Sequence, residues 1–322
     1  MMLTLWISKV KSALASRYLF DNWFALLISY ALVRLGFNAK LKARISDRTI
    51  EIDPEVFAHL VSSFSRRQIR SIKSVANKLF VNDVEVNDIN DVVHDVKTFA
   101  KVLGWNYDDV SNCWVKNGVR FRHMHQSILG VFDYGEYQHL NVNGRVVYDI
   151  GAFVGDSPIY FALKGAKRVI ALEPNHEAFK EMLENIRLNK LQNVITPVNA
   201  GLAGKPGYAL KMLRGMRTQP TYHRVGECNC EIPAITLGEL ISKYGLDNYA
   251  VLKMDCEGCE YDIILNDYEH VKAFKELIFE YHEYAVSKPV SKLLKVLGQD
   301  YHCKVLERHK KWGTGIVYSV RR

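Results

Sequence analysis

Two stretches of this chain each carry an apolar run into a polar, glycine-containing segment that a helix can follow. The first spans residues 146–157, and Gly151 and Gly155 follow its apolar run. The second spans residues 252–265 and groups several ionisable residues around Gly258. Because ligands of open α/β sheets bind at the carboxyl ends of the parallel strands, we expect both segments to face one crevice.

From residue 141 onward, strand-like and helix-like patterns alternate along the chain. The helix-like segments have apolar residues at helical spacing, as in Phe179, Met182, Leu183 and Ile186. Parallel strands are expected at residues 145–150, 168–173, 194–199, 249–254 and 276–282, with a closing hairpin at residues 301–306 and 315–320. This order predicts a doubly wound parallel sheet with an antiparallel edge.

Local signals mark where several helices begin and end. Ser157 followed by Pro158 predicts a helix whose N-cap is Ser157, and Gly165 is expected to end it. Thr236 and Glu239 have the spacing of a capping box. A later helix is expected over residues 287–298.

The first glycine loop has the features of a nucleoside-binding site. Its glycines allow close approach of a ligand, and the N-terminus of the following helix offers free N–H groups. Glu173 ends the next strand, where a carboxylate can accept both hydrogen bonds of a ribose diol, and Asn199 ends the third strand, where an amide can read an adenine edge. Asp149 and Asp156 would repel a diphosphate, so the loop favours a cationic ligand such as S-adenosylmethionine.

These residues lie in four blocks whose order and spacing resemble the FkbM family of S-adenosylmethionine-dependent methyltransferases. The blocks are residues 149–157, 173–175, 184–189 and 253–260, and the similarity covers roughly residues 145–285. The resemblance implies a Rossmann-like class I methyltransferase sheet and methyl transfer to a hydroxyl oxygen. The expected cofactor-binding residues are Asp149, Gly151, Ala152, Gly155, Asp156, Ser157, Glu173 and Pro174 in these segments, together with Asn199 at the end of the third strand.

Catalysis is assigned to polar residues that end the fourth and fifth strands: Asp255, Glu257, Glu280 and His282. A hydroxyl acceptor needs a general base, because a neutral alcohol is a poor nucleophile. We place His282 first for this role and Asp255 second. The prediction includes no metal, although these same four residues could instead hold magnesium or manganese. Lys253 and Glu260 are expected to form a structural ion pair that braces the turn.

The six cysteines give little sign of a metal site or of a disulfide framework. Cys228 and Cys230 could join Cys256 and Cys259 in a zinc site, but Cys-x-Cys is not the usual spacing. Cys256 and Cys259 are therefore expected to act as small apolar fillers. The size of the chain and the lack of a secretory signal favour a reduced, cytoplasmic setting.

Residues 1–140 lie outside the resemblance and are expected to form an α+β appendage that covers the acceptor side of a domain at residues 141–322. A hairpin is expected at residues 40–52 and a basic amphipathic helix at residues 62–79. A strand at residues 118–125 would place His123 and His125 on one face, where a solvated pair is favoured over a metal site. Glu136 and Tyr137 precede the first core strand and are well placed to touch the cofactor or acceptor, or to pack.

The apolar run at residues 23–33 is too short to span a membrane and predicts a helix that is buried or faces a partner, including another copy of the chain. Lys9, Lys11 and Arg17 precede it, so an interfacial membrane helix is the alternative. The formal charge of +8 permits attraction to phosphates but does not by itself indicate a nucleic-acid partner.

The predicted function is O-methylation of a hydroxyl of a sugar, glycan or small metabolite by S-adenosylmethionine. An RNA methyltransferase is the runner-up, because residues 185–189 are reminiscent of tRNA guanine methyltransferases. Against this alternative, no Asn/Asp-Pro-Pro motif follows the fourth strand. A scaffold that binds the cofactor without catalysis is the third possibility.

Overall fold

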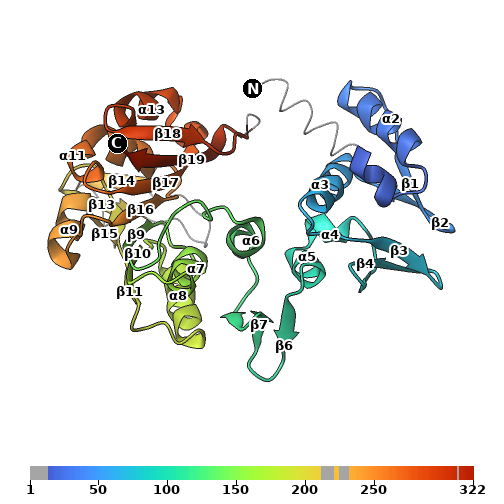
Figure 1. Ribbon diagram of the computed structural model, residues 1–322, viewed down its shortest axis with the longest axis horizontal. Helices are drawn as coiled ribbons and strands as arrows, with labels where there is room; N and C mark the ends of the chain where they lie inside the picture. The colour runs from blue at the N-terminus through green and yellow to red at the C-terminus, as the bar shows by residue number, and fades with distance from the viewer. Residues whose placement is uncertain (1–13, 212–220, 225–231, 310–311) are drawn as a thin grey trace. The chain divides into compact units, whose positions relative to one another are not determined.

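The computed structural model describes residues 14–211, 221–224, 232–309 and 312–322. The chain divides into two compact units, Met1–Gln126 and Ser127–Arg322, which are considered separately below (Figure 1). The division falls before the expected boundary at residue 140, because the segment after Gln126 packs with the second unit. Within that unit Phe132 lies edge-on to Tyr160, and Tyr137 hydrogen-bonds to Asp255.

The second unit is built on a seven-stranded sheet in the order β11-β10-β9-β16-β17-β19-β18. Its strands are β9 (Val146–Ile150), β10 (Arg168–Leu172), β11 (Ile195–Val198), β16 (Val251–Met254), β17 (Glu276–His282), β18 (Tyr301–Val305) and β19 (Thr314–Arg321). The first five in this order are parallel, and β19 runs antiparallel between β17 and β18. This confirms the predicted class I methyltransferase sheet with its antiparallel edge.

Helices cover both faces of this sheet, because the strands are buried on both sides and alternate apolar residues between the two layers. One face packs on α9, α10, α11 and α13 through Leu240, Ile264, Val271 and Leu293. The other face contacts α7 and α8, which Figure 1 shows together on the side away from α9. The helices are α7 (Asp156–Leu163), α8 (His176–Leu188), α9 (Leu237–Tyr244), α10 (Cys259–Asn266), α11 (Tyr268–Val271), α12 (Glu283–Val286) and α13 (Ser291–Leu297).

Two short segments and a small sheet complete the second unit. The segments α6 (Gln126–Leu129) and η2 (Gly130–Tyr134) precede β9. The small sheet has the order β12-β15-β13-β14, formed by β12 (Gly201–Leu202), β13 (Tyr208–Lys211), β14 (Thr221–Arg224) and β15 (Ile232–Ile235).

The helix starts predicted from the sequence agree with the structure at α9 but not at α7 or α13. The Thr236–Glu239 capping box opens α9 as predicted. The prediction that Ser157 caps α7 was wrong: the helix starts at Asp156 with Gly155 as its N-cap, and the Ser157 hydroxyl donates to Asp149 instead. The helix expected from residue 287 begins only at Ser291.

The first unit contains short helices and three small sheets around its own buried residues. Its elements are η1 (Ser16–Tyr18), α2 (Trp23–Arg34), β1 (Leu41–Ile45), β2 (Arg48–Ile52), α3 (Pro54–Ser65), β3 (Ile72–Val75), β4 (Lys78–Val81), β5 (Val84–Val86), α4 (Asp91–His94), α5 (Val96–Val102), β6 (Asn106–Asp108), β7 (Cys113–Lys116) and β8 (Val119–Phe121). The predicted hairpin at residues 40–52 is confirmed by β1 and β2. His123 and His125 lie beyond the end of β8, with their rings 6.4 Å apart and edge-on.

The basic helix predicted at residues 62–79 was wrong. Helix α3 ends at Ser65, and the remainder forms β3 and β4, joined by a turn at Ala76 and Asn77. Ile72 and Leu79 are buried while Lys73 and Lys78 are exposed. Two of the charges that suggested a solvated helix face, Lys73 and Lys78, are therefore on the solvent face of two strands, where residues alternate with period two.

Helix α2 is less buried than its apolar sequence predicts. Leu26 is buried, whereas Phe24, Ile28 and Leu32 are 64%, 49% and 38% exposed. None of the helices in the described part of the chain has the length and apolar character needed to cross a bilayer. The alternative of an interfacial membrane helix depended in part on Lys9 and Lys11, and both lie outside the described residues.

Candidate functional site

The loop between β9 and α7 touches the end of β16 directly. Gly151 has a φ of +79°, and a Cβ at this position would lie 1.8 Å from the carbonyl oxygen of Asp255. Only glycine fits such an approach without moving the backbone. The two polar strand ends recognised in the sequence are therefore in contact, as their places in a parallel sheet predicted.

A buried lysine joins the same two strand ends. Lys253 on β16 faces Asp149 on β9, with 3.0 Å between its Nζ and the Asp149 Oδ1, and both side chains are buried. Lys253 Nζ also donates to the carbonyl oxygen of Gly151 at 2.6 Å. Burial works to lower the pKa of Lys253, but the carboxylates of Asp149, Asp255 and Asp156 outweigh it and raise that pKa. The predicted pairing of Lys253 with Glu260 was wrong, because Asp149 is nearer and Glu260 holds other groups.

Replacing Lys253 with methionine is expected to lower the free energy of unfolding by about 3–5 kcal/mol, because Asp149 would be left charged and buried without its partner. The measurement is urea unfolding of the full chain followed by circular dichroism. Lys180 is exposed on α8, and its replacement by methionine is the matched control, with an expected effect within about 0.5 kcal/mol. Equal effects of the two substitutions would contradict a bracing role for Lys253.

Glu173 follows β10, the neighbour of β9, and its carboxylate braces the glycine loop. Its Oε2 accepts a hydrogen bond from the backbone N–H of Phe153 at 2.8 Å, and its Oε1 accepts from that of Asn175 at 2.6 Å. The side chain is buried, and burial raises the pKa of Glu173 to about 7. Each oxygen retains lone-pair capacity, so the predicted bonds to a ribose diol remain possible at this position.

The other expected cofactor residues lie around the same loop. Asn199 donates its side-chain amide to the carbonyl oxygens of Glu173 at 2.8 Å and Pro174 at 3.2 Å. Asp156 is buried at the start of α7, and burial raises its pKa to about 6. Ala152, within the loop, is buried. The loop and the ends of β9, β10 and β11 thus form one connected structure, while direct contact of these residues with a cofactor stays a prediction.

At the ends of β16 and β17, three residues bring ionisable groups together. The ligand atoms of Asp255, Glu280 and His282 all lie within 4.8 Å of one another. Tyr137 donates its hydroxyl to Asp255 Oδ2 at 2.9 Å, which fixes one side of that carboxylate. The predicted shared face of Glu280 and His282 is what directs both toward Asp255.

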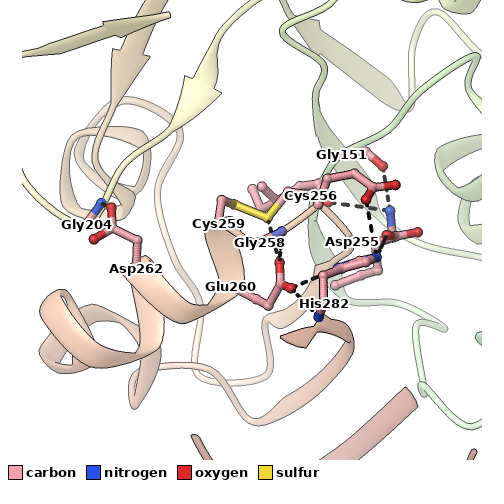
Figure 2. Close-up of a disulfide and its surroundings, with 12 residues drawn as sticks. Gly151, Gly204, Asp255, Cys256, Gly258, Cys259, Glu260, Asp262 and His282 are labelled. Carbon is pink, nitrogen blue, oxygen red and sulfur yellow. Dashed lines mark hydrogen bonds and ion pairs between the residues drawn. A yellow bond between two sulfur atoms is a disulfide. The ribbon is translucent and has the colours of Figure 1, made fainter. Parts of the chain in front are cut away.

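Glu260 sets the orientation of the His282 ring (Figure 2). Its Oε1 accepts hydrogen bonds from the His282 backbone N–H at 2.9 Å and from the ring Nδ1 at 2.8 Å. The opposite nitrogen, Nε2, faces Asp255 Oδ1 at 3.8 Å and Glu257 Oε2 at 3.7 Å. Burial works to lower the pKa of His282, but the carboxylates of Glu260, Asp255 and Glu257 raise it to about 9.

Two further carboxylates carry raised pKa values at this end of the sheet. Burial and then the charge of Asp255 raise the pKa of Glu280 to about 8, and the same causes raise the pKa of Glu136 to about 8. Glu257 is more exposed and accepts a hydrogen bond from the Tyr284 hydroxyl. Without a cation, Glu280 and Glu136 therefore tend to keep their protons near neutral pH, because additional negative charge is costly in this partly desolvated environment.

Cys256 and Cys259 form a disulfide within the acidic motif, which corrects the expectation that they are simple apolar fillers (Figure 2). Their Cα atoms lie 5.4 Å apart, and the bond encloses Glu257 and Gly258. The disulfide also removes these two thiols from the four-cysteine zinc alternative. Cys228 and Cys230, its other members, lie outside the described residues.

The sequence interpretation missed the role of Glu260. It recognised Glu260 as part of the motif but assigned it to Lys253, although its actual partner, His282, is 22 residues away. A signal was present, since Glu260 lies in the first turn of α10 and His282 ends the strand beside β16. Glu136 and Tyr137 were named but not assigned, and Tyr137 proves to hold Asp255.

Comparison with known proteins covers the part of the chain that forms this site. Residues 149–302 match the Methyltransferase FkbM domain. A curated relative, the hexuronic acid methyltransferase AglP of Haloferax volcanii, is 25% identical over 149 residues, which are 46% of this chain and 61% of that protein. The match thus spans less than two thirds of that relative.

Solved structures of methyltransferases are similar to part of the chain at low identity. The O-methyltransferase from Bacillus cereus, solved in complex with SAH, is 12% identical, with a TM-score of 0.39 over 59% of this chain and 81% of that one. The ribosomal protein L11 methylase from Lactobacillus delbrueckii is 16% identical, with a TM-score of 0.38 over 62% and 81%. Residues 149–302, just under half of the chain, are thus similar to the FkbM family of methyltransferases.

Proposed function

We propose that this protein transfers a methyl group from S-adenosylmethionine to a hydroxyl oxygen of a sugar, with a hexuronic acid residue of a glycan as the preferred acceptor class. The observation that carries the proposal is the contact between Gly151 and Asp255. This contact places the loop that is expected to bind the nucleoside of the cofactor beside Asp255, Glu280 and His282. The hexuronic acid is suggested by the name of the relative from Haloferax volcanii.

The cofactor would lie over the loop that follows β9. Glu173 is placed to accept hydrogen bonds from its ribose, and the start of α7 offers backbone N–H groups. The carboxylate of Asp156 and the acidic strand ends beyond it suit the positive charges of the amino and sulfonium groups. A phosphate-bearing cofactor would instead meet repulsion from these acids.

Methyl transfer itself is an in-line displacement in which the oxygen attacks the methyl carbon as the bond to sulfur breaks. The protein has to align the hydroxyl, exclude water and remove the hydroxyl proton. His282 was placed first as the base from the sequence. Its pKa of about 9 means that the free ring is mostly protonated at neutral pH, so we favour Asp255 as the proton acceptor.

The structure weakens the basis of the RNA alternative. Asn185, in the motif that suggested it, is buried in α8 and donates its side-chain amide to the carbonyl oxygen of Val154 at 2.8 Å. Asn189 donates to the carbonyl oxygen of Asn185 at 2.8 Å. The motif therefore supports the cofactor loop from beneath, and this structural role accounts for its asparagines without an RNA partner.

The test is transfer of a labelled methyl group from S-adenosylmethionine to three separate acceptors: oligosaccharides that contain hexuronic acid, matched neutral oligosaccharides and total RNA. We expect label in the acidic oligosaccharides, released as O-methyl sugar after hydrolysis. Label confined to RNA would overturn the proposal. Cofactor binding without label in any acceptor would favour the non-catalytic scaffold.

Partners beyond the acceptor remain proposals. Residues 1–140 are proposed to recognise the acceptor. Contact with a membrane surface or with a second copy of the chain is proposed for helix α2, supported by the exposure of Phe24, Ile28 and Leu32 along one stripe.

A further inference from the structure

We propose that Asp255, Glu280 and His282 form a binding site for one divalent metal cation. The three side chains come from the carboxyl ends of the adjacent parallel strands β16 and β17, and their ligand atoms lie within 4.8 Å of one another. An octahedral cation with bonds of about 2.1 Å needs ligand atoms about 3.0–4.2 Å apart. The largest separation among the three ligand atoms, at most 4.8 Å, exceeds that range by about 0.6 Å or less.

The strongest evidence is the orientation of His282. The residue is 3% exposed, and its Nδ1 is engaged with Glu260, a residue that is itself fully buried. In the described part of the chain, Nε2 has no hydrogen-bond partner, and its nearest carboxylate oxygens are 3.7 and 3.8 Å away. A buried carboxylate that fixes one imidazole nitrogen while the other faces acidic oxygens is the arrangement that prepares histidine for a metal.

The two carboxylates also have oxygens to spare. Tyr137 occupies only Oδ2 of Asp255, and Oδ1 is the atom that faces His282. Among the described residues, the side chain of Glu280 accepts no hydrogen bond, although Glu280 is only partly exposed. Partly buried carboxylates without donors are uncommon, because their desolvation is left uncompensated.

A cation would stabilise the charged form of the carboxyl groups at this end of the sheet. Glu136, Asp255 and Glu280 interact with one another, and no lysine or arginine of the described residues forms an ion pair with any of them. The nearby cation, Lys253, is directed to Asp149 and to the carbonyl oxygen of Gly151. S-adenosylmethionine would bring positive charge to the crevice, but its sulfonium cannot accept a lone pair from an imidazole, whereas a metal can.

Two carboxylates and one imidazole favour manganese or magnesium over soft metals. Three protein ligands leave coordination positions open, which water and an acceptor hydroxyl can occupy. A cation bound there would lower the pKa of that hydroxyl. This catalytic role rests on the proposed function, whereas the binding site itself does not.

The test is titration of the full-length chain with Mn²⁺, after removal of metals by a chelator and in the absence of S-adenosylmethionine and acceptor. Free Mn²⁺ is followed by electron paramagnetic resonance. We expect one bound Mn²⁺ per chain, with affinity at least about 10-fold weaker in His282→Gln and in Glu280→Gln. Glu260→Gln should also weaken binding by about 10–100-fold, since it loosens the ring without removing a ligand.

Glu269→Gln is the matched control, because Glu269 is an exposed acid on α11 that pairs with Lys272. Its Mn²⁺ affinity should equal that of the wild type, and thermal melts establish that each variant is folded. Absence of stoichiometric binding in the folded wild type would overturn the site, as would binding that His282→Gln and Glu280→Gln leave unchanged. Because neither cofactor nor acceptor is present, these outcomes are independent of whether methyl transfer to a glycan is observed.

Discussion

Replacing Glu173 with alanine is expected to weaken the binding of S-adenosylmethionine by at least about 100-fold. Two hydrogen bonds from ribose hydroxyls to a carboxylate are each worth about 1.5–3 kcal/mol, and the substitution removes both. It also removes the acceptor that holds the N–H of Phe153 in the cofactor loop. Isothermal titration calorimetry on the purified chain gives the affinity directly.

The pH dependence of the same measurement makes this prediction more specific. Burial raises the pKa of Glu173 to about 7, so the carboxylate is protonated below that pH and becomes a poorer acceptor. The affinity of the wild type should therefore rise between pH 6 and pH 8. In Glu173→Gln, which has no charge to lose, this rise should be much smaller. Asp156, with a pKa of about 6, adds a further loss only at lower pH.

An unchanged affinity in Glu173→Ala, or a pH profile that Glu173→Gln leaves intact, would show that Glu173 only braces the loop. The control is Glu177→Gln, an exposed acid in the first turn of the neighbouring α8. It alters the charge close to the site without touching the loop, and its affinity and pH profile should match those of the wild type.

Asp255→Asn is expected to reduce the rate of methyl transfer by about 100- to 10,000-fold, the range typical of a lost general base. The amide fits the same space and can still accept from Tyr137, so the affinity for the cofactor should change only a few-fold. The measurement is turnover with labelled S-adenosylmethionine and the acceptor found in the transfer experiment, together with calorimetry for cofactor binding.

Tyr137→Phe provides the graded comparison. It leaves the Asp255 carboxylate in place but removes the 2.9 Å hydrogen bond to it, so we expect a smaller loss of turnover. If Asp255→Asn retains near-normal turnover while His282→Gln does not, Asp255 is not the base, and the Mn²⁺ titration of His282→Gln then separates a role of His282 as base from a role as metal ligand. Loss of cofactor affinity equal to the loss of turnover would instead place Asp255 in cofactor binding.

The sheet and the places of its polar ends could be predicted because they follow from local pattern. The runs at residues 146–150 and 251–254 are apolar apart from Asp149 and Lys253, which is typical of strands buried on both faces. Their order then fixes which ends lie side by side. The prediction of one helix at residues 62–79 was wrong because the local pattern there does not mark the turn. The tight turn at Ala76 and Asn77 contains no glycine or proline.

The internal partners of the site residues could not be predicted in the same way. Lys253 had several acidic neighbours in the motif, whereas Glu260 and His282 are 22 residues apart, and only the three-dimensional register decides which groups pair. The use of Glu173 as a brace depends on the path of the loop around Phe153. Pairing over such distances in the sequence is set by the packed sheet rather than by spacing.

The disulfide between Cys256 and Cys259 makes the geometry of the acidic motif dependent on the thiol chemistry of its surroundings. The bond closes a ring that spans residues 256–259 and includes Glu257. Asp255 lies directly before this ring and Glu260 directly after it. A dithiol reductant would open that ring by exchange, converting the bond to two thiols while the reductant becomes a disulfide. Samples of this protein kept with and without dithiothreitol are therefore two chemical species that differ beside the predicted base, and their rates should be recorded separately.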